Sequence, residues 1–523
     1  MKKENESEVV VAQTCYSTDR KVTIGNEDNL NIEKSRINAI TEFRPSKKSK
    51  TLTLDKASEY NLLGMRETFP NITSLKIGEK VTSIKMLNKT FPNIREVKSS
   101  SPHFLSGDML IKNIKNFSGE SFNILLNAFC RKAEEPINFE GVSEIADLAL
   151  NGCLSSDIQC TSSLRAFFKD ALKGSAFDFE NEDTWNGDGP VMFGSCLIGF
   201  KRNTSSFNLT DGLGIDNFVL LDNYKPITKI SVSRARLLHI FSSIPDDRMI
   251  CDYLYISDTS NFRSELVNQR IPLPAAHVQI NPGNNYLKSE NDIICNADMT
   301  TVEASAWFIS GVVKIPDGVL RVEENGFLSD SITELQIPES VNYVQPGSMW
   351  NGDKIKLIET KGENLPRGCV SAVCRDFLPF NDDRDDVIEI ISKNAHVFIP
   401  RYASEKYIST IDMLCSEDLA SANDTFRYAL SNTIKYHVLK RSYDVLKDKS
   451  YFEIIKQSIA PILIFLIKDG EIDEAVNLVT SNYDFVKEKA YDILECIKKN
   501  GNKINVSNYD AFLTKFKELK FIS

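Results

Sequence analysis

The chain has 523 residues, which is more than a single hydrophobic core accommodates, so we expect several domains or an extended repeat array. Hydrophobic residues make up 42% of the sequence and charged residues 26%, a balance that excludes a disordered or membrane-embedded chain. The formal net charge of -10 argues against a general nucleic-acid-binding surface, which requires clustered lysine and arginine.

Residues 1–20 are predicted to form a flexible N-terminus. The opening stretch MKKENESEVVVAQ carries two lysines but lacks the apolar stretch of about 7–15 residues that a secretory signal needs. The longest apolar run, Ile459 to Ile467, is interrupted by Pro461 and is shorter than the ~20 residues that span a bilayer. We therefore expect a cytoplasmic protein; a cell-surface location would apply if a signal had been removed from this chain.

A repeat begins in the next segment. The letters TFPNI occur at 68–72 and again at 90–94, an offset of 22 residues, and Phe69 and Phe91 are expected to point inward. After the first copy the apolar residues follow a fixed pattern, Leu75-x-Ile77-xxx-Val81-xx-Ile84. Two apolar residues at a spacing of two predict a short strand with one buried face.

The same spacing recurs along much of the chain, in copies that begin at Ile158, Phe218, Ile293, Val313 and Leu335, with a copy one residue shorter at Ile137. Periods of about 20–29 residues with one short strand each are typical of a leucine-rich solenoid, whose units must stack to share a core. We therefore predict an α+β fold: a leucine-rich-repeat solenoid with short parallel strands over 21–410, then a small all-α helical domain.

Two irregular insertions are predicted in the solenoid, near 105–135 and 180–290. Within the first, SFNILLNAFCRKAEE at 121–135 has apolar residues at helical spacing. In the second, ENEDTWNGDGPVMFGSCLIGFKRNTSSF at 180–207 is rich in Gly, Asn and Asp, which predicts long loops.

The units VVKIPDGVLRVEENGFLSD and ELQIPESVNYVQPGSMWNG resemble those of the BspA-type leucine-rich repeat family. The Ile-Pro pairs at 315–316 and 337–338, the Ala-Leu at 149–150 with Cys153, and the Ala-Phe at 176–177 carry the resemblance. HVFIPRYASEKY at 396–407 looks like the terminal strand-and-cap unit of that family. The resemblance implies a right-handed solenoid that serves as a protein-recognition scaffold without catalysis.

From residue 411 to residue 523 the apolar period becomes helical, which predicts antiparallel helical hairpins. Gly470 and Gly501 follow lysine-containing helix ends, as expected of C-terminal caps. The stretch LIKDGEIDEAVNLV looks like one tetratricopeptide or ankyrin hairpin.

No pattern predicts catalysis, a metal or a cofactor, so we expect no enzyme. The five histidines are far apart and lack metal-binding spacing. A calcium loop that starts at Glu182 would place Phe193 where a glutamate is required. The run DDRDD at 382–386 is interpreted as a solvated loop. The cysteine pairs Cys153/Cys160 and Cys369/Cys374 do not have a zinc-site pattern, and the first pair is expected in the repeat core.

The exposed strand positions between the buried pairs are the candidate partner-binding residues: Lys76, Lys314 and Gln336. We predict a non-catalytic recognition scaffold that binds a protein partner through the sheet face and loops, with no nucleic acid as partner. The alternatives are an effector or toxin-like enzyme whose solenoid selects the target, and a cell-surface adhesion protein.

Overall fold

A computed structural model describes residues 10–13, 22–23, 39–45, 48–115, 119–221, 223–245, 247–268, 273–349, 352–374, 387–422, 432–500 and 504–522. The predicted flexible segment 1–20 therefore falls largely outside the described residues. The chain forms two compact units. Unit 1 comprises Met1–Ser257 with Ile271–Pro274, and unit 2 comprises Asp258–Arg270 with Ala275–Ser523. Each unit is described by itself.

Unit 1 begins with two parallel ladders that run through the same coils. One is the three-stranded sheet of β4 (Thr51–Leu54), β6 (Ser74–Ile77) and β8 (Glu96–Ser99), here named sheet 1. The other joins β3 (Ala39–Arg44), β5 (Glu59–Asn61) and β7 (Ser83–Lys85), with β1 (Val10–Gln13) and β2 (Val22–Thr23) antiparallel at its edge. The register pairs Leu52 with Leu75 and Leu75 with Val97, so each coil advances by one repeat. The predicted solenoid with short parallel strands is confirmed.

The structure places two short strands in each of these coils, where the sequence predicted one. The first buried pair of the repeat, Leu75 and Ile77, lies in β6, whereas Ile84 lies in β7. The TFPNI segments lead from one coil into the next. As predicted, Phe69 and Phe91 point inward: both are buried, and they stack with their ring centroids 5.6 Å apart. Stacked aromatic rings from successive coils help to make the core continuous.

The predicted helix at 121–135 is wrong. Residues Ser121–Asn127 form strand β10, which pairs antiparallel with β9 (Leu110–Lys115) and parallel with β12 (Glu144–Ile145). Neighbouring side chains of β10 pack on opposite faces, since Leu125 belongs to the cluster that follows and Leu126 packs against the cluster that precedes it. A strand that is buried on both faces places apolar residues next to one another, which also satisfies a helical spacing.

The coils continue with β11 (Ile137–Asn138) parallel to β13 (Ile158–Gln159), and with β12 parallel to β14 (Ala166–Phe167). The predicted core position of Cys160 is wrong, because this residue is exposed and has a positive φ of 57°. Chain direction changes directly after β13, so the alternation of buried and exposed residues is lost at that point.

The stretch predicted as long loops, 180–207, contains regular structure instead. A one-turn helix α1 (Glu182–Trp185) precedes an antiparallel hairpin of β15 (Pro190–Phe193) and β16 (Cys196–Phe200). Every residue of β16 is buried, so this strand carries little of the alternation that marks a strand in sequence. Unit 1 ends with β18 (Asn217–Phe218), the 3-10 helices η2 (Asp211–Leu213) and η3 (Ala235–Ser243), and the parallel strands β17 (Ser206–Leu209), β19 (Ile227–Val232) and β20 (Cys251–Ile256).

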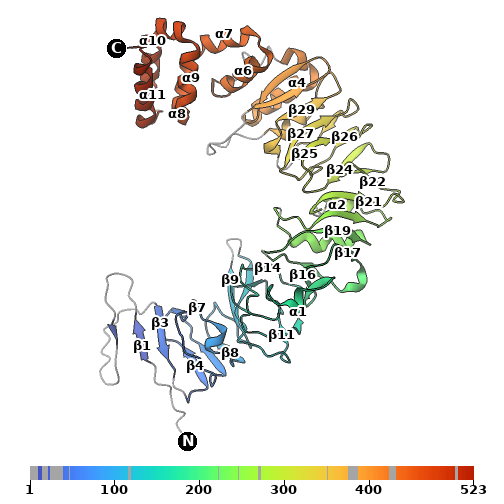
Figure 1. The fold of residues 1–523 in the computed structure, drawn as a ribbon, viewed down its shortest axis with the longest axis vertical. Helices are drawn as coiled ribbons and strands as arrows, with labels where there is room; N and C mark the ends of the chain where they lie inside the picture. The colour runs from blue at the N-terminus through green and yellow to red at the C-terminus, as the bar shows by residue number, and fades with distance from the viewer. Residues whose placement is uncertain are drawn as a thin grey trace. The chain divides into compact units, whose positions relative to one another are not determined.

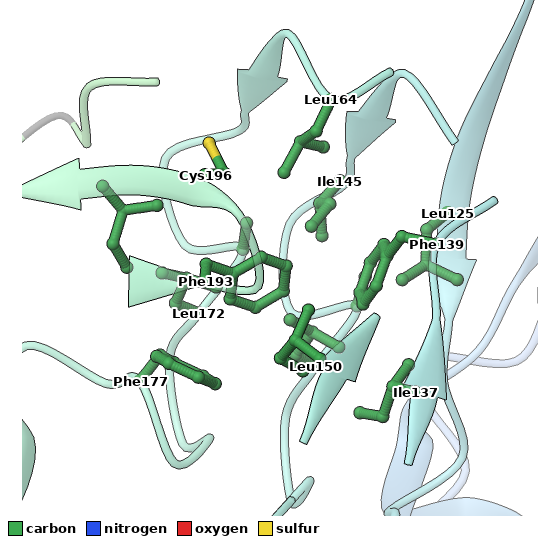
Figure 2. Close-up of a cluster of buried hydrophobic side chains, with 14 of the residues drawn as sticks. Leu125, Ile137, Phe139, Ile145, Leu150, Leu164, Leu172, Phe177, Phe193 and Cys196 are labelled. Atoms are coloured by element: carbon green, nitrogen blue, oxygen red, sulfur yellow. The ribbon is translucent and has the colours of Figure 1, made fainter. Parts of the chain in front are cut away.

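Phe193 lies at the centre of the core that these coils share (Figure 2). Its ring centroid is 5.0 Å from that of Phe139, 5.5 Å from that of Phe167 and 4.9 Å from that of Phe177, and the three pairs are edge-to-face. Phe193 is a fully buried core residue whose side chain has no oxygen ligand, so it does not act as the twelfth position of a calcium loop.

Unit 2 begins with α2 (Arg263–Asn268) and β21 (Ala275–Ile280), followed by the antiparallel strands β22 (Leu287–Glu290), β23 (Ile293–Asn296) and β24 (Thr301–Ser305). The repeat copy predicted at Ile293 therefore lies in an antiparallel hairpin instead of a parallel coil. Strand β24 continues as a parallel ladder with β26 (Arg321–Val322) and β28 (Tyr343–Val344).

The second ladder of unit 2 is a five-stranded sheet, here named sheet 2. Its strands are β25 (Gly311–Lys314), β27 (Ile332–Ile337), β29 (Leu357–Thr360), β30 (Val387–Ile391) and β31 (His396–Pro400), in that order. The first four strands are parallel, and β31 runs antiparallel to β30. Strands β25, β27 and β29 lie side by side in Figure 1.

The predicted helical region follows sheet 2 and is confirmed: α4 (Glu405–Glu417), α6 (Asn432–Leu446), α7 (Lys449–Gln457), α8 (Ile459–Asp469), α9 (Ile472–Ser481), α10 (Tyr483–Lys499) and α11 (Val506–Glu518). Gly470 ends α8 in the left-handed conformation, as predicted, whereas Gly501 lies outside the described residues. Helices α8 to α11 pack together around one apolar cluster (Figure 1). Within the described residues no single helix is long and apolar enough to cross a membrane, although the bent pair α7 and α8, at 76°, matches in length and composition.

Candidate interaction surface

The outer face of each parallel sheet consists of the side chains that alternate with the buried ones. In sheet 1, Lys76 is exposed between the buried Leu75 and Ile77, as the repeat predicts. Register places Lys76 between Thr53 of β4 and Lys98 of β8, so two lysines stand on neighbouring strands. This row of sheet 1 is therefore basic.

The Glu96 carboxylate, in the adjacent row of sheet 1, already has two partners. The Lys98 ammonium lies 2.5 Å from Glu96, and the Ser74 hydroxyl donates to the same carboxylate at 2.8 Å. The hydrogen bond from Lys98, followed by that from Ser74, lowers the pKa of Glu96. Among the described residues Lys76 has no ion-pair partner, which leaves its charge available to a ligand.

Sheet 2 brings the other two predicted residues together. Lys314 of β25 is in register with Gln336 of β27, and Gln336 is in register with Glu359 of β29. Lys314 is exposed and Gln336 is half-buried. Lys76 belongs to unit 1, so it is not part of this row.

Gln336 is held by two carboxylates. Its side-chain amide donates to Oε1 of Glu334 at 2.9 Å, two residues earlier on the same strand, and to Oε2 of Glu359 at 3.2 Å. Two hydrogen-bond partners restrict the otherwise flexible glutamine side chain, so this part of the outer face is preorganised.

A shallow groove of about 250 Å³ opens at the end of these strands. Lys314, Gln336 and Glu359 line it, and Lys361 and Asp317 form an ion pair at its wall, with the ammonium 3.2 Å from Oδ1. The rest of the lining is mainly apolar or backbone: Ile315, Ile337, Pro338, Thr360 and Ile391. The groove therefore combines an apolar floor with charged walls.

Helix α6 covers the far end of the same outer face. Phe398 of β31 pairs with Glu389 of β30, which places it on the outer face, and yet its side chain is fully buried. Helix α6 packs against β30 and β31, and the Arg441 guanidinium on this helix lies 4.0 Å from Glu389. The open part of the outer face thus consists of β25, β27 and β29, together with Ile391 at the end of β30, which lines the groove.

Helix α4 is tied to the last coils by buried polar groups. The Asp412 carboxylate accepts hydrogen bonds from the backbone N–H groups of Gly368 at 2.8 Å and Val370 at 2.9 Å, at the start of α3 (Cys369–Val373). The buried Arg401 guanidinium donates to the carbonyl oxygens of Gly352 and Ile355. The Asp412 bonds hold α4 against α3, and the Arg401 bonds hold the residues between β31 and α4 on the preceding coil, so α4 covers the end of the solenoid in unit 2.

The sequence did not single out Glu334 and Glu359. In β29 the repeat reads Ile358-Glu359-Thr360, and the polar Thr360 in place of an aliphatic residue concealed the strand pattern. Glu334 lies two residues before Gln336 on the same strand and reaches its amide within β27. Glu359 is brought to Gln336 only by the register of β27 and β29.

Among the described residues no group of three or more His, Cys, Asp or Glu side chains is arranged to hold a metal ion. His277 contacts Asp292 at 2.9 Å and His396 contacts Glu389 at 2.7 Å, so these histidines take part in structural pairs. Cys369 and Cys374 are buried at the ends of α3, and burial raises the pKa of the Cys369 thiol. The DDRDD run at 382–386 lies outside the described residues.

No family model matches the chain, and no curated protein matches it. Among solved structures, a leucine-rich cell surface protein from Faecalibacterium prausnitzii is 10% identical with a TM-score of 0.16, over 60% of this chain and 60% of that chain. The pneumococcal vaccine antigen PcpA is 11% identical with a TM-score of 0.18, over 74% of this chain and 79% of that chain. A leucine-rich repeat protein from Eubacterium ventriosum is 12% identical with a TM-score of 0.14, over 66% of this chain and 75% of that chain.

The chain thus spans 60% of the length of the Faecalibacterium protein. Because these TM-scores are low, the solenoid assignment rests on the parallel register of the strands themselves. The BspA-type resemblance and the tetratricopeptide or ankyrin likeness of the tail remain predictions.

Proposed function

We propose that this chain is a non-catalytic recognition scaffold that binds a protein partner through the outer faces of its parallel sheets. The observation that carries the proposal is the open part of sheet 2, where Lys314, Gln336 and Glu359 cross three strands beside a groove. A rigid sheet holds such side chains at fixed spacing, which reduces the entropy lost on binding.

The outer face of sheet 1 gives a second, basic contact area around Lys76 and Lys98. Stable protein interfaces bury about 800 Å² on each partner, which a single groove of this size does not provide. The proposed partner therefore contacts neighbouring strand faces and the loops beside them as well as the groove.

The proposal is tested best with point variants of the full chain. Truncating the chain before α4 would remove Asp412 from the α3 amides, and truncating it before α6 would uncover Phe398. Either deletion exposes buried groups, and the resulting loss of binding would not identify a surface.

We suggest affinity capture from a lysate of the source cells with the intact chain and with the variants Lys76→Glu and Lys314→Glu, followed by mass spectrometry. Charge reversal at an interface typically weakens binding about tenfold or more, so a partner lost with either variant is bound by that sheet face. Lys80→Glu and Lys288→Glu are matched controls, because both lysines are exposed and lie off the two faces. A partner that is captured equally by all four variants, or a turnover activity that depends on a specific residue, would contradict the proposal.

A further inference from the structure

The groove on sheet 2 carries both signs of charge in one row. Lys314, Gln336 and Glu359 stand on three consecutive strands in register. Adjacent strands are about 4.8 Å apart, so the backbone positions of Lys314 and Glu359 are separated by roughly 9.6 Å. A ligand that crosses the strands meets a cation, an amide and a carboxylate in that order.

These charges are not neutralised by described residues. Lys361, the other lysine of the groove, is paired with Asp317, whereas Lys314 has no ion-pair partner in the ranges that the structure describes. Glu334 and Glu359 both accept from the Gln336 amide, and neither carboxylate contacts a cation of the described chain. Both ends of the row therefore keep the capacity for an ion pair with a ligand.

The size and surroundings of the groove indicate the kind of ligand. A volume of about 250 Å³ is smaller than the 300–1,000 Å³ or so of a typical small-molecule pocket and accommodates one or two side chains. The neighbouring row of the same face consists of Val312, Glu334 and Leu357, which are in register on three strands. This row offers apolar contacts, since Val312 is 56% exposed. A polypeptide segment uses both rows, whereas a small zwitterion uses only the first.

We propose that the open part of sheet 2 binds an extended peptide segment of mixed charge, with an acidic residue over Lys314 and a basic residue over Glu334 and Glu359. This inference rests on the proposed function and names the chemistry of the partner at that surface. In an extended segment, residues two apart share one face at a spacing of about 6.8 Å, and a long arginine or lysine side chain spans the remaining distance.

The test uses blocked, fluorescently labelled heptapeptides and the full chain, with binding read by fluorescence anisotropy. Four charge types are compared: one acidic and one basic residue, two basic residues, two acidic residues and none, each at spacings of two, three and four residues. We expect the mixed peptides to bind tightest to the unmodified chain, by roughly tenfold over the neutral ones, and to lose this advantage at high salt.

Two variants then reverse the preference. Lys314→Glu leaves a row of carboxylates, so it is expected to prefer the doubly basic peptides. Glu359→Lys places a second lysine beside Gln336, so it is expected to prefer the doubly acidic peptides over the doubly basic ones. Lys288→Glu is the matched control and should keep the preference for mixed charge. Thermal unfolding of each variant shows that the fold is retained.

Equal binding of all four charge types to the unmodified chain, or an unchanged preference in Lys314→Glu, would overturn the inference. That failure is distinct from failure of the proposed function. If the peptides fail to discriminate while Lys314→Glu still loses a captured protein, the surface is used but its partner has other chemistry. If neither experiment depends on Lys314 and the captured proteins are also unchanged in Lys76→Glu, both proposals are wrong.

Discussion

The cap formed by Asp412 permits a quantitative prediction. Its carboxylate accepts from the backbone N–H groups of Gly368 at 2.8 Å, Val370 at 2.9 Å and Ser371 at 3.3 Å. Hydrogen bonds to a charged group contribute about 1.5–3 kcal/mol each, and a buried amide left without a partner costs a further 1–3 kcal/mol or so. Counting only the two short bonds, we expect Asp412→Ala to destabilise the junction of α3 and α4 by about 3 kcal/mol.

The change is measured best by hydrogen–deuterium exchange, because two compact units make a single unfolding free energy ill-defined. A loss of about 3 kcal/mol corresponds to roughly a hundredfold faster exchange in peptides that cover residues 365–374. Alanine has a higher helix propensity than aspartate, so α4 itself is not weakened by the substitution. Asp418→Ala, at the exposed end of α4, is the control. Unchanged protection of the α3 amides in Asp412→Ala would refute the reasoning.

Three further changes test the packing and electrostatics of the solenoid. Phe193→Ala should lower the free energy of opening of the core around it by about 3–5 kcal/mol, since its ring contacts three others; hydrogen exchange of the surrounding strands measures this. Phe168, whose side chain is 44% exposed, is the control, and Phe168→Ala should cost under 1 kcal/mol or so. Gly368→Ala should destabilise the last coils, because φ is +83° and the added Cβ would overlap a carbonyl oxygen of the preceding coil; limited proteolysis reports this. The hydrogen bond from Arg95 lowers the pKa of Glu135 to about 2. The ionised Glu135 therefore stabilises the fold fully above about pH 4.5, and this stabilisation is lost as the pH falls towards 2. In an acid titration of stability, Glu135→Gln should lack this loss between pH 4.5 and 2.

The repeat itself could be predicted because its signal is local. The pair Leu75 and Ile77 alternates with exposed residues, and the same spacing occurs one coil earlier at Leu52 and Leu54, so the strand and its buried face follow from the sequence. The second strand of each coil could not be predicted in this way. Strand β7 has three residues and only Ile84 is buried in it, and one apolar position does not define an alternation.

Strands with two buried faces were the main source of error. In β10 and β16 adjacent apolar residues pack on opposite sides, so neither strand shows the spacing of two that marks a half-buried strand. The candidate surface, too, could be predicted only in part. The positions of Lys314 and Gln336 on the outer face followed from alternation, although Gln336 is half-buried and not exposed as predicted. The contact of Gln336 with Glu359, 23 residues away, depends on the register between strands. Register across coils is set by packing of the whole ladder and is not visible in a single repeat.

The reversal of β31 at the end of sheet 2 has a consequence for self-association. A parallel ladder ends in a strand whose outward backbone groups can recruit an identical strand from another molecule. Here the final strand runs antiparallel to β30, and α6 packs across both strands and buries Phe398. A second copy of the chain therefore finds no apolar template on this face of the last two strands. Weakening the contact between α6 and β31 should therefore uncover Phe398 and increase self-association.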